Sequence, residues 1–178
     1  MTHRPVDARI ESGGPEDEEG TGEYAPPKDF KEAMARWATG VSIVAARDPD
    51  DGRVHATTVG SVGGVSADPP RVIFSLGSGA QVLPFLREGR TLVVNILSAR
   101  QRRLASVYTD PYPVGPSPFP EAGPPVIPGS HVIVTCRVER IIPVNGSHLI
   151  LAGVAEARTS DDEAGPLIYY HRAYRELT

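Results

Sequence analysis

The chain has 178 residues, 40% of them hydrophobic, and a formal net charge of -4. This favours one domain with a real core and argues against nucleic-acid binding, which rewards a basic surface. The single cysteine excludes an internal disulfide and a cysteine-based zinc cluster. No apolar run approaches the roughly 20 residues that span a bilayer, and residues 1–25 contain no apolar signal-peptide core. We therefore expect a cytoplasmic protein that does not bind membranes.

Residues 1–25 are predicted to be a disordered acidic tail. They include ESGGPEDEEGTGEY, which is acidic and nearly free of large apolar residues. Such a segment cannot bury enough surface to offset its ordering entropy. An acidic docking arm is the functional alternative. The folded domain is expected over residues 26–178.

The segment PPKDFKEAMARWATG predicts the first helix. Asp29 and Glu32 have the spacing of a capping box, and Gly40 suits the position just past the helix end. Four residues fall at helical spacing and predict a stripe facing the core: Phe30, Ala33, Met34 and Trp37.

Strand patterns dominate the middle of the chain. Apolar or β-branched runs predict strands at 41–46, 54–59, 71–76 and 91–97. Between the last two, Pro84 limits any helix to a short one. Residues 98–108 predict a helix that begins with a capping box of Ser98 and Gln101.

Residues 109–130 contain eight prolines, which predicts a loop over a surface or a pocket. Two further strands, 131–144 and 147–157, flank Asn145-Gly146, a strong hairpin signal. A short strand at 167–170 follows. About six antiparallel strands with two or three helices predict a mainly β protein, a barrel with helical covers, because βαβ alternation is missing.

Ordinary catalytic constellations are missing from the sequence. The five histidines have no metal-ligand spacing, so no metal site is predicted. No nucleophile elbow, phosphate loop or dinucleotide fingerprint is present. Cys136 alternates with apolar residues in a strand and is interpreted as a buried structural thiol.

The stretch HATTVGSVGGVSADPP, residues 55–70, is rich in small and hydroxyl residues. It offers no acid, base or nucleophile of the usual kind. A reaction whose chemistry comes from a bound cofactor needs none, because the protein then supplies position and excludes side reactions. Small residues and exposed backbone would let an aromatic ring lie close.

Five segments, in order and with plausible spacing, resemble the flavin reductase-like family. They are FKEAMARWATGVSIVAA, HATTVGSVGGVSADPPRVIFSLG, LVVNILSARQRRLA, HLILAGVAEA and PLIYYHRAY. The resemblance covers about residues 29–176. It implies an antiparallel split β-barrel of the FMN-binding type, present as a homodimer. It also implies binding of FMN or FAD, hydride uptake from NADH or NADPH, and delivery of reduced flavin to a partner monooxygenase.

The resemblance also implies a site. His148 matches a position near the flavin and nicotinamide and is the candidate catalytic residue. The stretch from Thr58 to Ser61 matches the wall along the flavin ring. The candidate cofactor-binding residues are Thr58, Val59, Gly60, Ser61, Ser75, Gly77, Asn95, Ile96, Leu97, Ser98, Gln101 and Tyr174.

The chain departs from the family pattern at several positions. Gly63 and Gly64 stand where the family usually has threonine and serine. Ala80 and Val82 stand where a serine and a threonine commonly hold the flavin phosphate. Fewer polar contacts to flavin are therefore implied.

Each candidate also has a structural interpretation. His148 could be a core histidine, Asn95 could bond backbone at a strand end, and the glycines could serve turns or bulges. Arg100, Arg102 and Arg103 form either a solvated helix face or a phosphate contact. Two other functions stay open: a repurposed barrel that catalyses a redox-neutral step without flavin, and a non-catalytic flavin-binding subunit.

Overall fold

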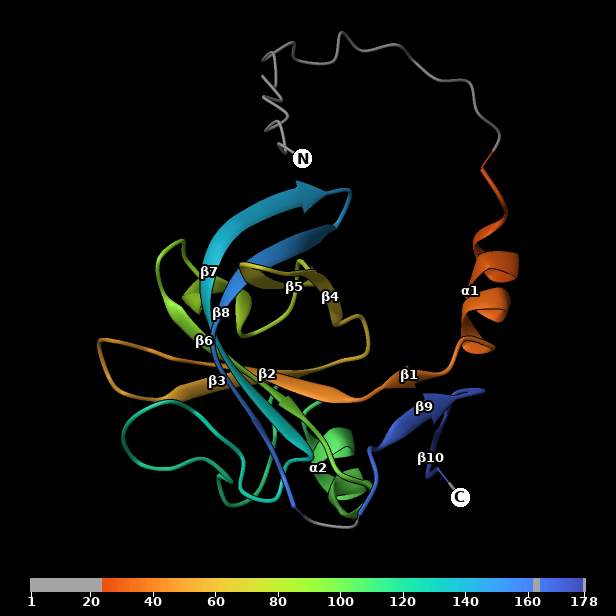
Figure 1. Ribbon diagram of the computed structural model, residues 1–178. Coiled ribbons are helices and arrows are strands. Elements are labelled where there is room, and N and C mark those ends of the chain that lie inside the picture. The colour runs from red at the N-terminus through yellow and green to blue at the C-terminus, as the bar shows by residue number, and fades with distance from the viewer. Residues whose placement is uncertain (1–23, 162–163, 178) are drawn as a thin grey trace, which may run out of the picture.

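The computed structural model describes residues 24–161 and 164–177. Residues 1–23 of the predicted acidic tail lie outside this range. The central element is a curved seven-stranded sheet with strand order β3-β2-β6-β7-β8-β5-β4 (Figure 1). Every neighbouring pair is antiparallel. The strands are β2 (Ser42–Arg47), β3 (Val54–Val59), β4 (Gly63–Ala67), β5 (Pro70–Gly77), β6 (Thr91–Ile96), β7 (Val132–Val144) and β8 (Ser147–Thr159). The prediction of a mainly β, antiparallel protein is confirmed.

The long β7–β8 hairpin turns at the predicted Asn145-Gly146 pair. Both residues have positive φ, 26° and 77°, the conformation that asparagine and glycine tolerate best. Strand β4 was not predicted, because it begins with two glycines, which are poor strand formers.

One core lies inside the curved sheet and receives side chains from strands near both ends of the sheet order. Val59 on β3 and Phe74 on β5 belong to the same buried cluster as Val94 on β6 and Ile150 on β8. Cys136 is buried in this cluster, and burial raises the pKa of its thiol to about 12. The thiol is therefore neutral at pH 7, which confirms its interpretation as a structural residue. The short 3-10 helix η1 (Leu83–Phe85) packs against the same core.

A second buried cluster lies on the outer side of β2, β3 and β6. It is covered by α2 (Arg102–Val107), which follows η2 (Ala99–Gln101), and by the proline-rich loop, through residues such as Ala105, Phe119 and Ile127. The predicted capping box of Ser98 and Gln101 is confirmed, with both reciprocal hydrogen bonds present.

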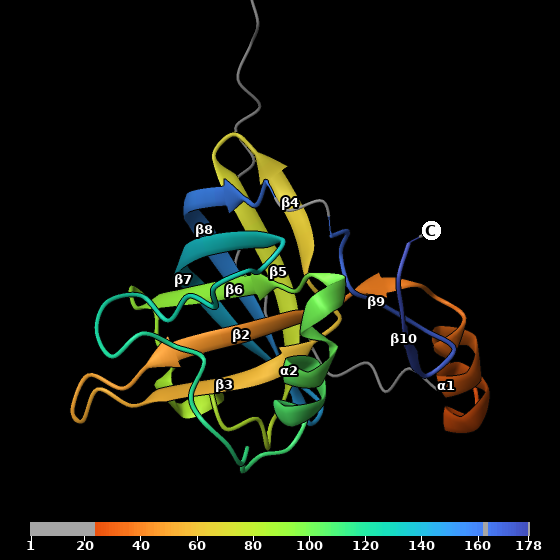
Figure 2. The same ribbon diagram turned by 90° about the horizontal axis from the view of Figure 1, so that it is seen from below.

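Helix α1 (Pro27–Ala35) stands beside a small sheet of β1 (Thr39–Gly40), β9 (Ile168–Tyr170) and β10 (Ala173–Arg175), in the order β1-β9-β10 (Figure 2). The two views agree that α1 lies next to β9 and β10. The backbone N–H of His171 donates to the carbonyl of Ala35 at 2.8 Å and ties the turn between β9 and β10 to the end of α1.

Three expectations for the first helix are wrong. Asp29 lies within the first turn and caps nothing, because the helix begins at the Pro26-Pro27 pair, where proline suits the first position. Gly40 belongs to β1, since the helix ends at Ala35. The apolar stripe faces away from the core, with Phe30, Met34 and Trp37 exposed at 60%, 43% and 66%.

No helix formed by the described residues combines the length and the apolar character that a membrane crossing requires.

Candidate functional site

The chain that leaves β3 is held against β5 by two serines. The Ser61 hydroxyl accepts a hydrogen bond from the Ser75 N–H at 2.9 Å and lies 3.2 Å from the Ser75 carbonyl oxygen, to which it donates. The two hydroxyl oxygens are 3.0 Å apart. The Ser61 side chain therefore extends the β4–β5 pairing, and its polar capacity is used within the chain.

Four glycines lie near this contact, and three of them leave open space where a side chain would stand. A Cβ at Gly63, Gly64 or Gly77 would have no atom of the described chain within 4 Å. A Cβ at Gly60 would lie 3.1 Å from the Thr39 Oγ1.

None of these four has a φ in the left-handed region. Their backbone conformation would accept other residues, so turn geometry does not require glycine at these positions. What they provide is exposed backbone without bulk, which suits the close approach of a flat ligand. We call Gly60, Ser61, Gly63, Gly64 and Gly77 the glycine wall.

His148 lies near the same end of the sheet, on β8. It pairs with Leu76 of β5, next to the Gly77–Ser147 pair. It shares a strand face with the fully buried Ile150, so its side chain points to the opposite face of the sheet from Ser75. Its Nδ1 is buried without a hydrogen-bond partner among the described residues. A purely structural core histidine would normally have that atom satisfied.

The Asn95 side chain anchors the proline-rich loop. It is fully buried, and its amide nitrogen donates to the carbonyls of Ile43 at 3.3 Å and Pro125 at 3.2 Å. Its Oδ1 accepts from the N–H of Ile127 at 2.7 Å. All of its polar atoms are bonded within the chain, as the structural interpretation expects.

The neighbours of Asn95 serve the same region. Gln101 bonds the N–H of Ser98 through its Oε1 and donates from its Nε2 to the carbonyl of Pro128 at 2.9 Å. Leu97 and Ser98 are buried. Ile96 instead packs against the inner core. We call Asn95, Ser98 and Gln101 the loop anchor.

The remaining predicted site residues are also placed by contacts within the chain. The Thr58 hydroxyl donates to the carbonyl of Ala105 at 2.9 Å and ties β3 to α2. Val59 is in the inner core. The Tyr174 ring contacts the Tyr169 ring, with centroids 5.5 Å apart, and the guanidinium of Arg102 lies 5.9 Å from its centroid.

The structure thus brings Ser61, with Gly60 beside it, to Ser75 of β5, and His148 pairs next to Gly77. Because Ser42 pairs with both Val59 and Ile96, Gly60 also lies only one strand away from the segment that follows β6. Sequence reasoning missed Thr39, whose hydroxyl borders Gly60. No local motif marks Thr39, because the contact depends on how β1 approaches the end of β3.

The two departures at the predicted phosphate positions have a packing explanation. Val82 is fully buried, and Ala80 packs against the same core. These side chains complete the core beneath the loop after β5. They offer no hydroxyl to a phosphate.

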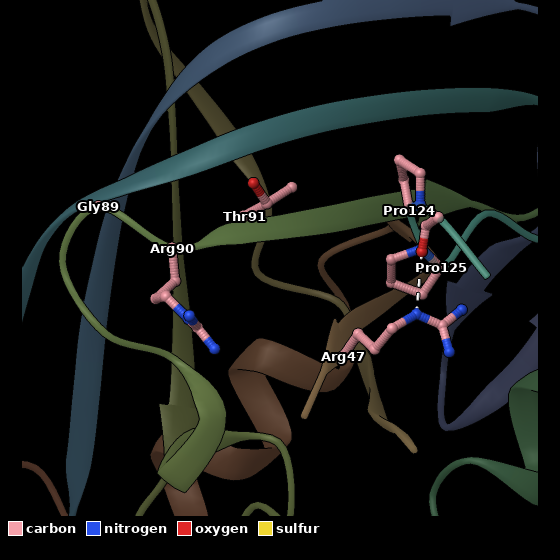
Figure 3. A pocket seen from close by; sticks show the side chains of 7 residues that line it. Arg47, Gly89, Arg90, Thr91, Pro124 and Pro125 are labelled. Atoms are coloured by element: carbon pink, nitrogen blue, oxygen red, sulfur yellow. Dashed lines mark hydrogen bonds between the residues drawn. The ribbon is translucent and has the colours of Figure 1, made fainter. Parts of the chain in front are cut away.

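Figure 3 shows a different cavity, of about 380 Å³, between the sheet and the proline-rich loop. It is lined by Arg47, Gly89, Arg90, Thr91, Gly123, Pro124 and Pro125. The Arg47 guanidinium donates to the carbonyls of Gly123 at 2.9 Å, Pro120 at 2.7 Å and Gly52. Because the Arg47 guanidinium is used to hold the loop against the sheet, we interpret this cavity as a gap between two packed parts of the fold and not as a ligand site.

Nowhere in the described part of the chain do three His, Cys, Asp or Glu residues gather as metal ligands would.

The fold and the site define a mainly β protein. Its candidate site consists mostly of small residues and exposed backbone, with His148 as the one titratable side chain among the predicted site residues near the glycine wall. The chain belongs to the flavin reductase-like family, because the model of the flavin reductase like domain matches residues 34–178.

The chain is similar to several characterised members of that family. It is 31% identical to the NADH:riboflavin 5'-phosphate oxidoreductase of Streptomyces pristinaespiralis, over 85% of this chain and 89% of that protein. It is also 31% identical to the reductase component of 4-hydroxyphenylacetate 3-monooxygenase from Thermus thermophilus, over 83% of this chain and 95% of that one. The styrene monooxygenase flavin reductase of Pseudomonas putida S12 has a similar structure, with a TM-score of 0.74 and 29% identity over 84% of this chain and 97% of that chain.

Proposed function

We propose that this protein is an NADH-dependent flavin reductase that supplies reduced FMN or FAD to a partner monooxygenase. The observation that carries the proposal is the glycine wall, which leaves open space at a sheet end in a chain of this family. Similar proteins bear the names of NADH-dependent flavin reductases and of reductase components of monooxygenases. The reduced nicotinamide that the reaction consumes is a cytoplasmic metabolite, and we place the protein there.

The residues present fit a flavin ring. Glycines without left-handed φ leave the backbone of the wall exposed, so that a flat ring system could lie against it and meet peptide groups. When bound, flavin supplies the redox chemistry, accepting a hydride from the nicotinamide. The task of the wall is to orient the two rings and to exclude water between them.

His148 is the proposed catalytic residue. Its Nδ1 is buried and unpartnered among the described residues, so the hydrogen bond expected of a structural core histidine is missing. A histidine at that point could hold or release a proton as charge develops on a ligand.

The segment after β5 supports loose binding of the flavin. Val82 and Ala80 fill the core and carry no hydroxyl for a phosphate. A site that recognises the ring more than the phosphate suits a flavin that leaves after reduction and is used by another protein.

The proposal includes a homodimer of split barrels. Helix α1 has nine residues and buries none of them, although an isolated helix shorter than about 12–15 residues is marginal in water. A second copy that covers Phe30, Met34 and Trp37 would stabilise it. Trp37 is the only tryptophan of the chain, so its fluorescence tests this directly. Emission should shift to the blue as the protein concentration rises, and a red emission maximum that does not change up to micromolar concentrations would contradict the dimer.

The function is tested by adding FMN or FAD with NADH or NADPH to the purified chain and following nicotinamide absorbance. We expect flavin-dependent oxidation of the nicotinamide. Folded protein that binds flavin without oxidising nicotinamide would be a flavin-binding subunit. Folded protein that does neither would indicate a repurposed barrel.

A further inference from the structure

A second cavity, of about 490 Å³, lies between helix α1 and the turn that joins β9 to β10. This volume is within the range of about 300–1,000 Å³ that is typical of small-molecule sites. The cavity is lined by Lys28, Glu32, Ala35, Arg36, His171 and Arg172.

The lining of this cavity is strongly positive. Lys28, Arg36 and Arg172 are cationic, and Glu32 is the only carboxylate among the lining residues. Glu32 lies 3.9 Å from Arg36, and both side chains are more than half exposed, so their attraction is weak. In a chain with a formal charge of -4, this concentration of positive charge is a local feature that would attract an anion.

The turn at one wall of the cavity uses unusual residues. His171 and Arg172 both have positive φ, 49° and 58°. The same conformation at the β7–β8 turn is filled by Asn145 and Gly146, the residues that such turns prefer. Histidine and arginine adopt this conformation only at a cost in backbone energy. A role for their side chains would account for their presence at this position.

Helix α1 presents this cavity on the face opposite its apolar stripe. At 3.6 residues per turn, Lys28, Glu32 and Arg36 lie about 180° around the helix from Phe30 and Met34. A second copy that packs on the apolar stripe would therefore leave the cavity open.

The cavity is connected to the glycine wall by the small sheet. Thr39 of β1 pairs with Tyr169 of β9, and its hydroxyl borders Gly60. His171 comes directly after Tyr170, the last residue of β9. A ligand whose ring lies on the wall and whose chain follows β9 would carry its far end toward the cavity.

We propose that this cavity binds the diphosphate of a dinucleotide, with Lys28, Arg36 and Arg172 as the cationic contacts. The proposal rests on the proposed function of the glycine wall, and both NADH and FAD carry the required diphosphate. Arginine suits this task because its guanidinium can offer two parallel hydrogen bonds to phosphate oxygens.

Calorimetry with inorganic pyrophosphate, ADP and adenosine tests the binding without any need for activity. Pyrophosphate and ADP should bind the full chain, and adenosine should bind much more weakly. In Arg36→Gln/Arg172→Gly the affinity for pyrophosphate should fall by about fivefold, the scale of two solvent-exposed charge contacts. Glycine at 172 suits the positive φ, so the turn should persist when the charge is removed.

Two matched variants control this experiment. Arg172→Lys keeps the charge but loses the paired hydrogen bonds of the guanidinium, so it should weaken pyrophosphate binding less than the double variant does. Arg53→Gln removes one positive charge from the exposed β2–β3 turn, outside the cavity lining, and should bind like the parent. Equal weakening in Arg53→Gln and in the double variant would overturn the proposal, because net charge alone would then explain the effect. Failure of pyrophosphate to bind the parent would overturn it as well.

Steady-state kinetics then identify the source of the diphosphate. If it belongs to the nicotinamide, the double variant should raise the KM for NADH and leave the KM for riboflavin and the kcat unchanged. If it belongs to FAD, the KM for FAD should rise while those for riboflavin and NADH stay the same. Unchanged KM values for both dinucleotides would overturn the proposal. An inactive parent that still binds pyrophosphate through Arg36 and Arg172 would instead contradict the proposed function and leave the anion site established.

Discussion

The glycine wall and the loop anchor both match motifs of the family, but the structure uses them in opposite ways. At the wall, three of four glycines face open space, and the one serine hydroxyl bonds β5. At the anchor, the polar atoms of Asn95 and Gln101 bond the proline-rich loop. The difference teaches that the polar side chains of the loop anchor build the scaffold, while the wall, where we propose that the ring binds, offers backbone and open space.

We expect the largest effect on flavin affinity from a bulky side chain at Gly60. Because a Cβ there would meet the Thr39 hydroxyl at 3.1 Å, the variant is best made with Thr39→Ala. Thr39→Ala/Gly60→Val should fold, and the valine should add bulk to the glycine wall. Overpacking of about 1–3 kcal/mol corresponds to a loss of about 5- to 150-fold in flavin affinity.

Flavin fluorescence quenching measures this affinity, and circular dichroism reports folding. Thr39→Ala alone is the matched control and should bind flavin nearly like the parent. If the double variant binds like the control, the wall does not contact the ring.

Asn95→Ala should show the reverse behaviour at the loop anchor. It leaves the Ile127 N–H and two carbonyls in a buried region without their partner. We expect a loss of about 3 kcal/mol in the free energy of unfolding, measured by urea denaturation. Thr91→Ala, at an exposed position of the same strand, is the control. A stable Asn95→Ala protein that fails to bind flavin would show that Asn95 contacts the ligand and does not only anchor the loop.

His148→Leu separates a catalytic role from a core role. The change removes a buried nitrogen that has no partner among the described residues, so the melting temperature should stay the same or rise. The kcat should fall by about tenfold or more if His148 takes part in proton transfer. A variant with unchanged kcat would show that this histidine is a packing residue.

Ser61→Ala should have a smaller effect than bulk at Gly60. It removes hydrogen bonds to Ser75, on the order of 0.5–1.5 kcal/mol, and should weaken flavin binding by less than about tenfold. Ser75→Ala removes only the contact between the two hydroxyls and should have less effect still. A larger loss in Ser61→Ala than in the Gly60 variant would mean that hydroxyls, and not open backbone, bind the ligand.

Removal of residues 1–25 should have the smallest effect. The segment has an acidic composition without apolar anchors, and α1 begins after it, at Pro27. The melting temperature and the flavin affinity should stay within error of the full chain. A clear fall in either would show that the tail contacts the domain.

Local patterns predicted what local forces decide. The Ser98–Gln101 capping box, the Asn145-Gly146 turn and the strand at 54–59 depend on neighbouring residues, and all three are confirmed. Strand β4 escaped prediction because Gly63 and Gly64 lack strand propensity and are paired by tertiary context.

Longer-range features could not be read in the same way. The apolar spacing in and after α1 was predicted to face the core, but Phe30, Met34 and Trp37 are exposed, because spacing alone does not say what a helix face packs against. The partners of Asn95 lie 30 residues or more away in sequence, so only the fold could show that it anchors a loop. The cavity beside Arg172 depends on the approach of α1 to a turn far along the chain, and no motif marks it.

Anaerobic stopped-flow reduction of FMN by NADH tests the central claim most directly, because bleaching of flavin absorbance reports hydride transfer itself. The account predicts rapid bleaching with the parent and with Thr39→Ala, and much slower bleaching with Thr39→Ala/Gly60→Val at an FMN concentration near the dissociation constant of the parent. Equal bleaching rates for the double variant and the parent would contradict the account, because the reaction would then take place away from the glycine wall.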